Sequence, residues 1–411
     1  MIIRKEYLHQ LEQWKDQKII KVITGIRRCG KSTLLQQFQD FLIQTGISEK
    51  QIIAINFEDL AFEELLDYQK LYAYITARLL TGKRMYVFLD EIQKVQDFEK
   101  VVDSLYIKDS VDVYITGSNA FLLSGDLATF LSGRYIEINM LPLAFREYMD
   151  EVNGENPDRV FAQYMKFGGM PYAVQLGQDA NRIDTYLEGI YNTILIKDIE
   201  DREKRRNDDP NKRRINDVTL LKNISRFLAS TVGSPVSLNK IAGYITSTGR
   251  KVSPTTVAEY VEALCEPYIF YRVQPINVSG KQLLDTVCKY YIADLGLRNY
   301  ILPRQNYDLG FSLENVVYLE LLRRGFEVNS GRIGMLEVDF VAKKNDLYRY
   351  YQVTASLTDQ KTFEREMKPF EQIKDNYPKT ILTLDRFSLG NYNGIQVVNA
   401  VDWLLDPGLD A

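Results

Sequence analysis

The stretch Gly25-Ile26-Arg27-Arg28-Cys29-Gly30-Lys31-Ser32 decides how the first part of this chain folds. The strand-like run Ile19 to Thr24 precedes it, and the amphipathic segment Lys31 to Gln44 follows it. Two glycines and a lysine at this spacing, between a strand and a helix, are typical of a loop that wraps its backbone N–H groups around phosphate oxygens. The sequence therefore predicts a phosphate-binding loop made by residues 25–32 together with Thr33.

Strand-like runs and helical patterns alternate after this loop. The further strand-like runs are Gln51 to Phe57, Met85 to Asp90, Val111 to Thr116 and Tyr135 to Met140, and the helical patterns are Glu63 to Leu80 and Asp97 to Ile107. This alternation predicts an α/β fold with a mostly parallel sheet covered by helices on both faces. Such sheets bind ligands at the carboxyl ends of their strands.

Two acids, Asp90 and Glu91, stand where the apolar run that begins at Met85 ends. That position brings them to the same edge of the sheet as the glycine-rich loop. We expect Asp90 and the Ser32 hydroxyl to hold Mg²⁺, Lys31 to neutralise the outer phosphates, and Glu91 to act as general base towards water. ATP and Mg²⁺ are the predicted ligands.

Two further polar positions have two interpretations each. Ser118, in the turn Thr116 to Asn119, is placed either to contact the terminal phosphate or attacking water, or to form an ordinary turn. Arg134 precedes the fifth strand, where it either stabilises transition-state charge, in its own chain or in a neighbour, or lies on the surface. Of Arg27 and Arg28, one contacts phosphate, or both face solvent or an adjoining domain.

Composition limits the remaining possibilities. The chain has 411 residues, a formal net charge of −4 and three widely spaced cysteines. Its length predicts several domains, and its charge gives no overall attraction to nucleic acid. The cysteines form no zinc or disulfide framework, and no apolar run is long enough to span a membrane, so we expect a cytoplasmic protein.

Composition shifts divide the chain into four predicted domains. These are an α/β core at 1–153, a helical lid and linker at 154–214, a winged helix at 215–278 and a last domain at 279–411. The lid is expected to be mainly helical over 158–206, broken at 168–171. The charge runs at 201–206 and 212–214 predict a solvated helix face because acids and bases alternate in them.

The winged helix is predicted from two helices, Leu238 to Thr246 and Pro254 to Cys265, and a ribbon at Tyr268 to Pro275. Arg250 and Lys251 in the preceding turn suit contacts to DNA phosphates. The second helix instead carries acids that would repel the DNA backbone, namely Glu259, Glu262 and Glu266. Docking of a protein partner is therefore an equal alternative to DNA binding.

Longer strings of this sequence resemble a known family. They are GIRRCGKSTL, FLDEIQ, TGSNAFLLSGDLATFLSGRY, LPLAFREY, YMKFGGMPY, KYYIADLGLRN, LENVVYLELLRRGFEV and EVDFVAKK. The chain is similar to bacterial and archaeal AAA+ P-loop ATPases of uncharacterised role, in which a winged helix and a restriction-endonuclease-like domain follow the ATPase core. The resemblance implies nucleotide-site roles for the loop residues, Asp90 and Glu91, phosphate sensing by Ser118 and an arginine finger at Arg134.

The resemblance also implies an endonuclease-like arrangement near the C-terminus. Its members would be Glu314 on a helix at Leu313 to Arg324, Glu337 and Asp339 on a strand, and Gln352 on the next strand. The pattern requires a lysine where this chain has Thr354. Lys361 would replace that lysine only if a loop folded back, so we expect a degenerate nuclease fold that binds rather than cleaves.

Three functions agree with the sequence. The first is an ATP-driven conformational switch acting on nucleic acid, and the second is an ATP-regulated nuclease. The third is an ATP-regulated protein-interaction module. A homo-oligomer is compatible with each of them, and none involves a membrane.

Overall fold

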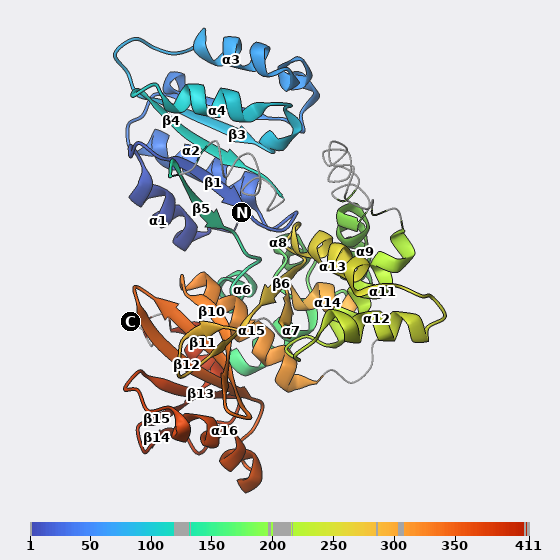
Figure 1. Ribbon diagram of the computed structural model, residues 1–411. Helices are drawn as coiled ribbons and strands as arrows, with labels where there is room; N and C mark the ends of the chain where they lie inside the picture. Colours follow the sequence, from blue (N-terminus) through green and yellow to red (C-terminus); the bar gives the residue numbers. More distant parts are fainter. Residues whose placement is uncertain are drawn as a thin grey trace. The chain divides into compact units, whose positions relative to one another are not determined.

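The computed structural model describes residues 2–118, 131, 133–195, 199, 215, 217–284, 287–302, 308–406 and 408. The chain forms two compact units (Figure 1). Unit 1 comprises Met1–Pro142 and Glu266–Tyr268, and unit 2 comprises Leu143–Cys265 and Ile269–Ala411. The predicted turn residue Asn119 and both charge runs, 201–206 and 212–214, lie outside the described residues.

Unit 1 contains the parallel sheet that the sequence predicts. The strands follow the order β2-β3-β4-β1-β5, and every neighbouring pair is parallel. Their bounds are β1 (Ile20–Thr24), β2 (Ile52–Asn56), β3 (Met85–Asp90), β4 (Val111–Thr116) and β5 (Tyr135–Asn139). Both β3 and β4 are buried along their whole length, because helices cover both faces of the sheet. The expected α/β core is confirmed.

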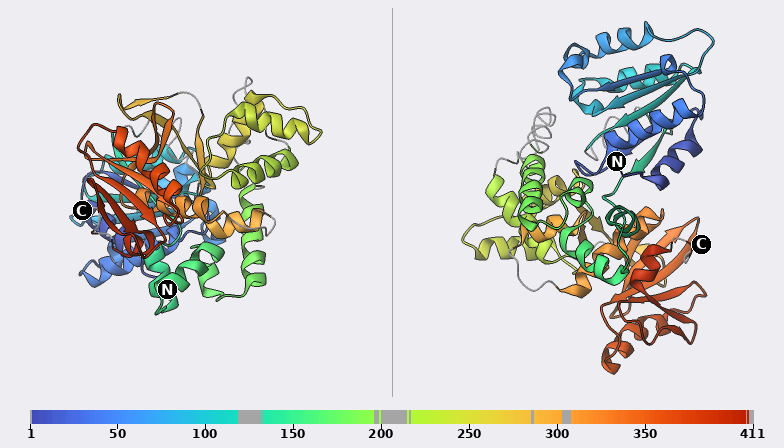
Figure 2. Two further views of the ribbon diagram at one scale, coloured as in Figure 1. Left: turned by 90° about the horizontal axis from the view of Figure 1, so that it is seen from below. Right: turned by 180° about the vertical axis from the view of Figure 1, so that it is seen from behind.

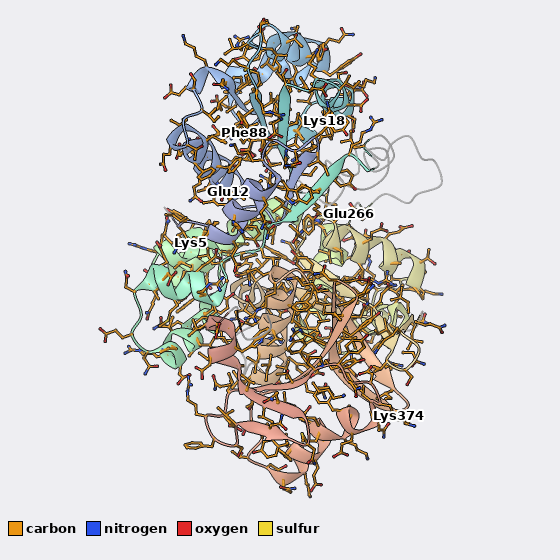
Figure 3. The ribbon with its side chains drawn as sticks, turned by 90° about the vertical axis from the view of Figure 1, so that its left-hand side faces the viewer. Lys5, Glu12, Lys18, Phe88, Glu266 and Lys374 are labelled. Carbon is orange, nitrogen blue, oxygen red and sulfur yellow. The ribbon has the colours of Figure 1, made fainter. Side chains whose placement is uncertain are left out.

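Helices pack on both faces of this sheet. They are α1 (Lys5–Trp14), α2 (Lys31–Gln44), α3 (Tyr68–Thr76) and α4 (Phe98–Tyr106), with 3-10 turns at Glu49–Gln51, Leu60–Leu66 and Ile92–Lys94. Aliphatic residues of α3 and α4 share one core with the sheet. On the other face, Phe88 of β3, labelled in Figure 3, is buried, with its ring centroid 6.3 Å from that of Phe38 of α2 and 4.7 Å from that of Tyr114 of β4.

One predicted helix of unit 1 is two elements in the structure. The pattern at Glu63 to Leu80 suggested a continuous helix, but a 3-10 turn ends at Leu66 and α3 begins at Tyr68. The carboxylate of Asp67 accepts the backbone N–H groups of Gln69 and Lys70 at 3.0 and 2.9 Å. A side chain that caps the following turn starts a new helix, and hydrophobic periodicity does not reveal this.

The first part of unit 2 is helical. Its helices are α6 (Phe145–Val152), α7 (Pro157–Phe167), α8 (Pro171–Gln175), α9 (Ala180–Thr193), α11 (Val218–Ser230), α12 (Leu238–Ser247) and α13 (Pro254–Cys265). The break at 168–171 lies where it was predicted. Two predicted winged-helix segments are helices here, α12 and α13. The winged-helix assignment itself and the four-domain division remain predictions.

The second part of unit 2 is built on a mixed sheet. Figure 2 shows its orange-to-red strands gathered together, with the green-to-yellow helices grouped beside them. The strand order is β14-β15-β13-β12-β11-β10-β7-β8. The bounds are β7 (Pro275–Asn277), β8 (Gln282–Leu283), β10 (Glu327–Ile333), β11 (Leu336–Lys344), β12 (Leu347–Thr354), β13 (Lys379–Thr383), β14 (Gly390–Tyr392) and β15 (Ile395–Asn399).

Within the described residues, four helices and a separate ribbon complete unit 2. The helices are α14 (Leu295–Ile301), α15 (Leu309–Arg323), α16 (Gln360–Gln372) and α17 (Ala400–Leu405). The ribbon pairs β6 (Phe270–Val273) with β9 (Lys289–Ile292) in antiparallel fashion. The sequence places β9 in the last predicted domain and β6 at the end of the predicted winged helix. In the structure, these two strands pair with each other.

Among the described residues, no helix is both long and apolar enough to cross a membrane.

Candidate active site

The loop after β1 has the backbone of a phosphate cradle. Gly25 adopts a φ of +140° and Gly30, which precedes α2, a φ of +108°. A Cβ atom on Gly25 would lie 2.1 Å from the carbonyl oxygen of Met140, so only glycine fits there. The buried guanidinium of Arg4 braces the loop from behind by donating to the carbonyl of Cys29 at 3.1 Å.

Lys31 lies inside this loop with only 4% of its surface exposed. Its Nζ donates to the carbonyls of Gly25 at 3.0 Å and Ile26 at 3.4 Å, and to Ser118 Oγ at 2.9 Å. The same Nζ is 3.9 Å from a carboxylate oxygen of Glu91. The ammonium therefore stands at the carboxyl edge of the sheet, between the loop and the acids.

The two acids after β3 face different partners. Thr116 Oγ1 donates to Asp90 Oδ1 at 2.5 Å, and it accepts the backbone N–H of Glu91 at 2.9 Å. Glu91 has a φ of +56°, which is rare for a residue with a side chain. This turn directs its carboxylate to Ser118, whose hydroxyl donates at 2.7 Å, while Gln93 donates to the other oxygen at 2.5 Å.

Burial and neighbouring charges separate the two carboxyls. Burial raises the pKa of Asp90, although hydrogen bonds from Thr116 and Ser32 oppose the change. Burial also acts to raise the pKa of Glu91, but the Lys31 ammonium and the donors Ser118 and Gln93 outweigh it, so that pKa lies below its usual value. Opposite shifts in adjacent acids are typical of sites where the two carboxyls have different tasks.

The residues present fit ATP with Mg²⁺. Glycines with positive φ leave the backbone N–H groups of the loop at the start of α2, where a phosphate is favoured. Ser32 and Asp90, which hydrogen-bond each other, line a cavity of about 400 Å³ beside the loop. A hydroxyl and a carboxylate are oxygen ligands of the kind that Mg²⁺ takes alongside nucleotide phosphates.

The other predicted residues of this site are placed differently. Arg28 is exposed, and Arg27 forms an ion pair with Glu58 at 3.4 Å. Thr33 lines the 400 Å³ cavity. Arg134 pairs with Asp103 of α4 and precedes β5 at the amino edge of the sheet, opposite to the loop.

Unit 2 brings together all four residues suggested by the endonuclease resemblance. Glu314 of α15, Glu337 and Asp339 of β11, and Gln352 of β12 line one cavity of about 610 Å³. Two residues that the sequence reasoning missed line it too, Lys289 of β9 and Glu366 of α16. Nothing in their spacing links β9 to β11, so only the fold reveals that Lys289 belongs here.

Two sequence expectations about the lysine of this cluster can be compared with the structure. Thr354 lines the cavity where the resemblance requires a lysine. Lys361 lies exposed on α16 and is not part of the cavity lining, so it does not replace the missing group. Lys289 instead brings an ammonium to the acids from a strand that is distant in sequence.

Sequence comparison places the chain among known proteins. A family model described as an AAA domain matches residues 17–149, and one described as a domain of unknown function matches residues 158–308. The chain is 37% identical over 410 residues to an uncharacterised protein of Haemophilus influenzae, covering 98% of this chain and 99% of that protein. It belongs to the same family.

The AAA-domain family reaches beyond bacteria. An uncharacterised protein of Methanocaldococcus jannaschii is 32% identical over 380 residues, covering 87% of this chain and 79% of that protein. The matched AAA domain contains the loop, Asp90 and Glu91, so this is a family of P-loop ATPases of uncharacterised role. The resemblance drawn from the sequence is confirmed at this level.

Two solved structures match much of this chain at low sequence identity. The Walker-type ATPase paby2304 of Pyrococcus abyssi is 17% identical with a TM-score of 0.46, covering 73% of this chain and 96% of that chain. AMPPCP-bound DnaA from Aquifex aeolicus is 15% identical with a TM-score of 0.33, covering 64% and 89%. Likenesses of this degree carry no argument about substrate or partner.

Proposed function

We propose that this AAA-domain protein hydrolyses ATP to ADP and phosphate with Mg²⁺ and uses the cycle as a conformational switch. The observation that carries the proposal is the hydrogen-bonded series from Lys31 through Ser118 to Glu91 at the carboxyl edge of the sheet. It joins a phosphate-neutralising ammonium, a hydroxyl and a base in one site. General-base hydrolysis of a bound nucleotide needs these three kinds of group.

Each residue has a distinct role in this proposal. The loop N–H groups and Lys31 bind the phosphates, and Ser32 and Asp90 hold Mg²⁺, which supplies further charge neutralisation when it is bound. Glu91 accepts a proton from the attacking water. The carboxylate is ionised at neutral pH, and the Lys31 ammonium with the donors Ser118 and Gln93 holds its pKa below the usual value.

The site also contains an element suited to switching. Both carboxylate oxygens of Glu91 are occupied, one by Ser118 and the other by Gln93. These two donors hold the carboxylate in one orientation, although each oxygen can still accept a further hydrogen bond from water. A terminal phosphate that draws Lys31 and Ser118 towards itself would release one oxygen of Glu91, which links the state of the nucleotide to the conformation of the turn after β3.

The partner of the switch is either nucleic acid or protein, and two observations favour protein. Arg250, a predicted phosphate contact, forms an ion pair with Asp217. Helix α13 presents acids and, over Pro254–Cys265, no basic residue. A protein partner therefore fits the predicted winged helix better than DNA does.

The test is phosphate release from Mg·ATP by wild type, Lys31→Ala and Glu91→Gln, with and without double-stranded DNA. Lys31→Ala is expected to abolish ATP binding and turnover, whereas Glu91→Gln is expected to keep binding and lose at least about a hundredfold in turnover. Turnover that Lys31→Ala leaves unchanged would contradict the proposed site. Stimulation by DNA would identify nucleic acid as the partner, and turnover that is indifferent to DNA supports a protein partner.

A further inference from the structure

The acidic cavity of unit 2 contains a lysine where an endonuclease would hold a metal ion. Glu314 projects into it from α15, and Glu337 and Asp339 project into it from β11. The Nζ atom of Lys289 is 2.8 Å from Glu314, 2.6 Å from Glu337 and 3.6 Å from Asp339. An ammonium has three hydrogens to donate, and three carboxylates surround this one.

The neighbouring carboxylates make this buried ammonium a permanent part of the cluster. Lys289 is 3% exposed and Glu314 is 5% exposed. Burial acts to lower the pKa of Lys289, but Glu314, Asp339 and Glu337 together outweigh it and raise that pKa above its usual value. The ammonium therefore stays charged, and its removal would leave buried carboxylates without a counter-charge.

Further protein donors contact carboxylate oxygens of the cluster, including one that Lys289 also contacts. Tyr291 donates its hydroxyl hydrogen to Glu314 Oε1 at 2.5 Å, and the backbone N–H of Val353 donates to Asp339 Oδ2 at 2.9 Å. The amide of Gln352 accepts the N–H of Asp339 at 2.6 Å and donates to Glu366 at 3.0 Å. The acids are thus arranged around hydrogen-bond donors.

This arrangement does not fit the divalent cation that an endonuclease-like fold implies. Mg²⁺ needs oxygens at about 2.0–2.1 Å in near-octahedral geometry, and an ammonium stands where those oxygens converge. Across the described part of the chain, no group of three or more His, Cys, Asp and Glu is arranged to hold a metal ion. The residues at the endonuclease-like site therefore do not fit a bound divalent cation.

We infer that Lys289 is a built-in counter-cation that fills the metal position of the Glu314, Glu337 and Asp339 cluster and excludes divalent cations. The ammonium joins β9 to α15 and β11, so its ion pairs link the ribbon to the large sheet. Metal-dependent cleavage of phosphodiesters is then absent from unit 2. The three carboxylates become a divalent-cation site only when the ammonium is removed.

The test counts the Mn²⁺ ions bound by the full-length, nucleotide-free chain, by isothermal titration calorimetry. All proteins carry Asp90→Asn, so that cations of the nucleotide site do not contribute. The chain with Lys289 intact is expected to show no Mn²⁺ site that depends on Asp339. Lys289→Ala is expected to gain one Mn²⁺ per chain, and adding Asp339→Asn to it is expected to abolish the gain.

Two further variants serve as controls for the Mn²⁺ titration. Lys343 is on β11, the strand that carries Glu337 and Asp339, and forms an exposed ion pair with Asp346. Lys343→Ala is expected to gain no Mn²⁺. Lys289→Met keeps most of the side-chain volume without the charge. Both Lys289 variants are expected to melt at a lower temperature than their parent, and Mn²⁺ is expected to raise the melting temperature of the variants but not of the parent.

The outcomes separate cleanly. An Mn²⁺ site in the parent that disappears with Asp339→Asn would overturn the inference, as would folded Lys289 variants that gain no cation. If neither variant folds with or without Mn²⁺, the parent decides alone: a site that depends on Asp339 overturns the inference, and its absence upholds it.

Discussion

Ser118 is the residue on which the proposed coupling depends, because it contacts both Lys31 and Glu91. It is 2% exposed and donates to Glu91 while it accepts from Lys31. We predict that Ser118→Ala lowers the turnover number about tenfold or more, since a hydrogen bond to a charged group contributes about 1.5–3 kcal/mol. The dissociation constant of ATP is expected to change little, because the loop backbone remains intact. Steady-state phosphate release and nucleotide titration measure both quantities.

Ser104 supplies the matched control for this change. Ser104 is half-buried on α4, and its hydroxyl donates to the carbonyl of Lys100. Ser104→Ala is expected to retain wild-type turnover. Equal turnover in Ser118→Ala and the wild type would refute the assignment of Ser118 and return it to an ordinary turn residue.

Asp294 is the residue with the clearest predicted pH dependence. Its buried carboxylate accepts the N–H of Gly169 at 2.6 Å and of Leu297 at 3.0 Å, yet burial raises its pKa to about 6. The folded state therefore holds the proton more tightly than the unfolded chain does. This contribution to stability is complete below about pH 4 and is lost as the pH rises through about 6, at about 1.4 kcal/mol per pKa unit.

The measurement compares melting temperatures at pH 5 and pH 7 by calorimetry. Asp294→Asn does not ionise in this range, so the part of the wild-type decrease due to this carboxyl is expected to disappear. The variant is also expected to melt lower at both pH values, because one accepting oxygen becomes a donor. Asp359→Asn, which alters an exposed helix cap on α16, is the control and is expected to keep the wild-type decrease. An unchanged decrease in Asp294→Asn would exclude Asp294 as its origin.

At the scale of elements, the connection from β1 to α2 depends on the absence of a side chain at Gly25. An alanine there would combine a φ of +140° with a Cβ only 2.1 Å from a backbone oxygen of Met140. We predict that Gly25→Ala abolishes ATP binding and costs about 2 kcal/mol of stability or more. Gly46 also has a positive φ, +95°, but nothing lies within 4 Å of its Cβ position. Gly46→Ala is expected to cost about 1 kcal/mol and to bind ATP normally.

Fluorescent-nucleotide titration and thermal denaturation of the two variants separate a steric effect from a conformational one. Both substitutions place alanine at positive φ, and only one meets a backbone atom. Equal losses of ATP binding in both variants would refute the steric explanation. Normal ATP binding by Gly25→Ala would show that the loop does not need this glycine.

The sequence predicted elements well where their signals are local. The strand that ends at Asp90 and the helix that begins at Lys31 have the bounds that hydrophobic pattern and motif indicate. Lys289 could not be predicted in the same way, because its three carboxylates lie 25 or more residues away and on two other elements. The packing of β9 against α15 brings that lysine to the acids, and hydrogen bonds between Ile292 and Asn315 hold the two elements together. The signal in the sequence was only indirect, because its four candidate residues, three acids and one amide, included no cation to balance their charge.

At the scale of the whole molecule, the position of Arg134 limits how it can act. Its backbone carbonyl accepts the N–H of Ile20 at the start of β1, whereas the phosphate loop begins after Thr24 at the other end of that strand. Five residues of strand span about 16 Å, which is more than an arginine side chain bridges. Arg134 therefore does not reach the nucleotide of its own chain along this edge. If it serves as an arginine finger, it serves a neighbouring copy.

This geometry predicts complementation between two inactive variants. Arg134→Ala is expected to lose at least about a hundredfold in turnover while it binds ATP normally, because arginine fingers act on transition-state charge. Lys31→Ala is expected to be inactive because its own loop fails. In an equimolar mixture, an intact loop beside an intact Arg134 would occur at about one quarter of the interfaces, so about one quarter of wild-type turnover should return. Arg78→Ala, an exposed arginine of unit 1 stacked on Tyr74, is the control and should remain active alone. A mixture no more active than the sum of its parts would exclude action in trans, and full turnover by Arg134→Ala alone would remove Arg134 from the site.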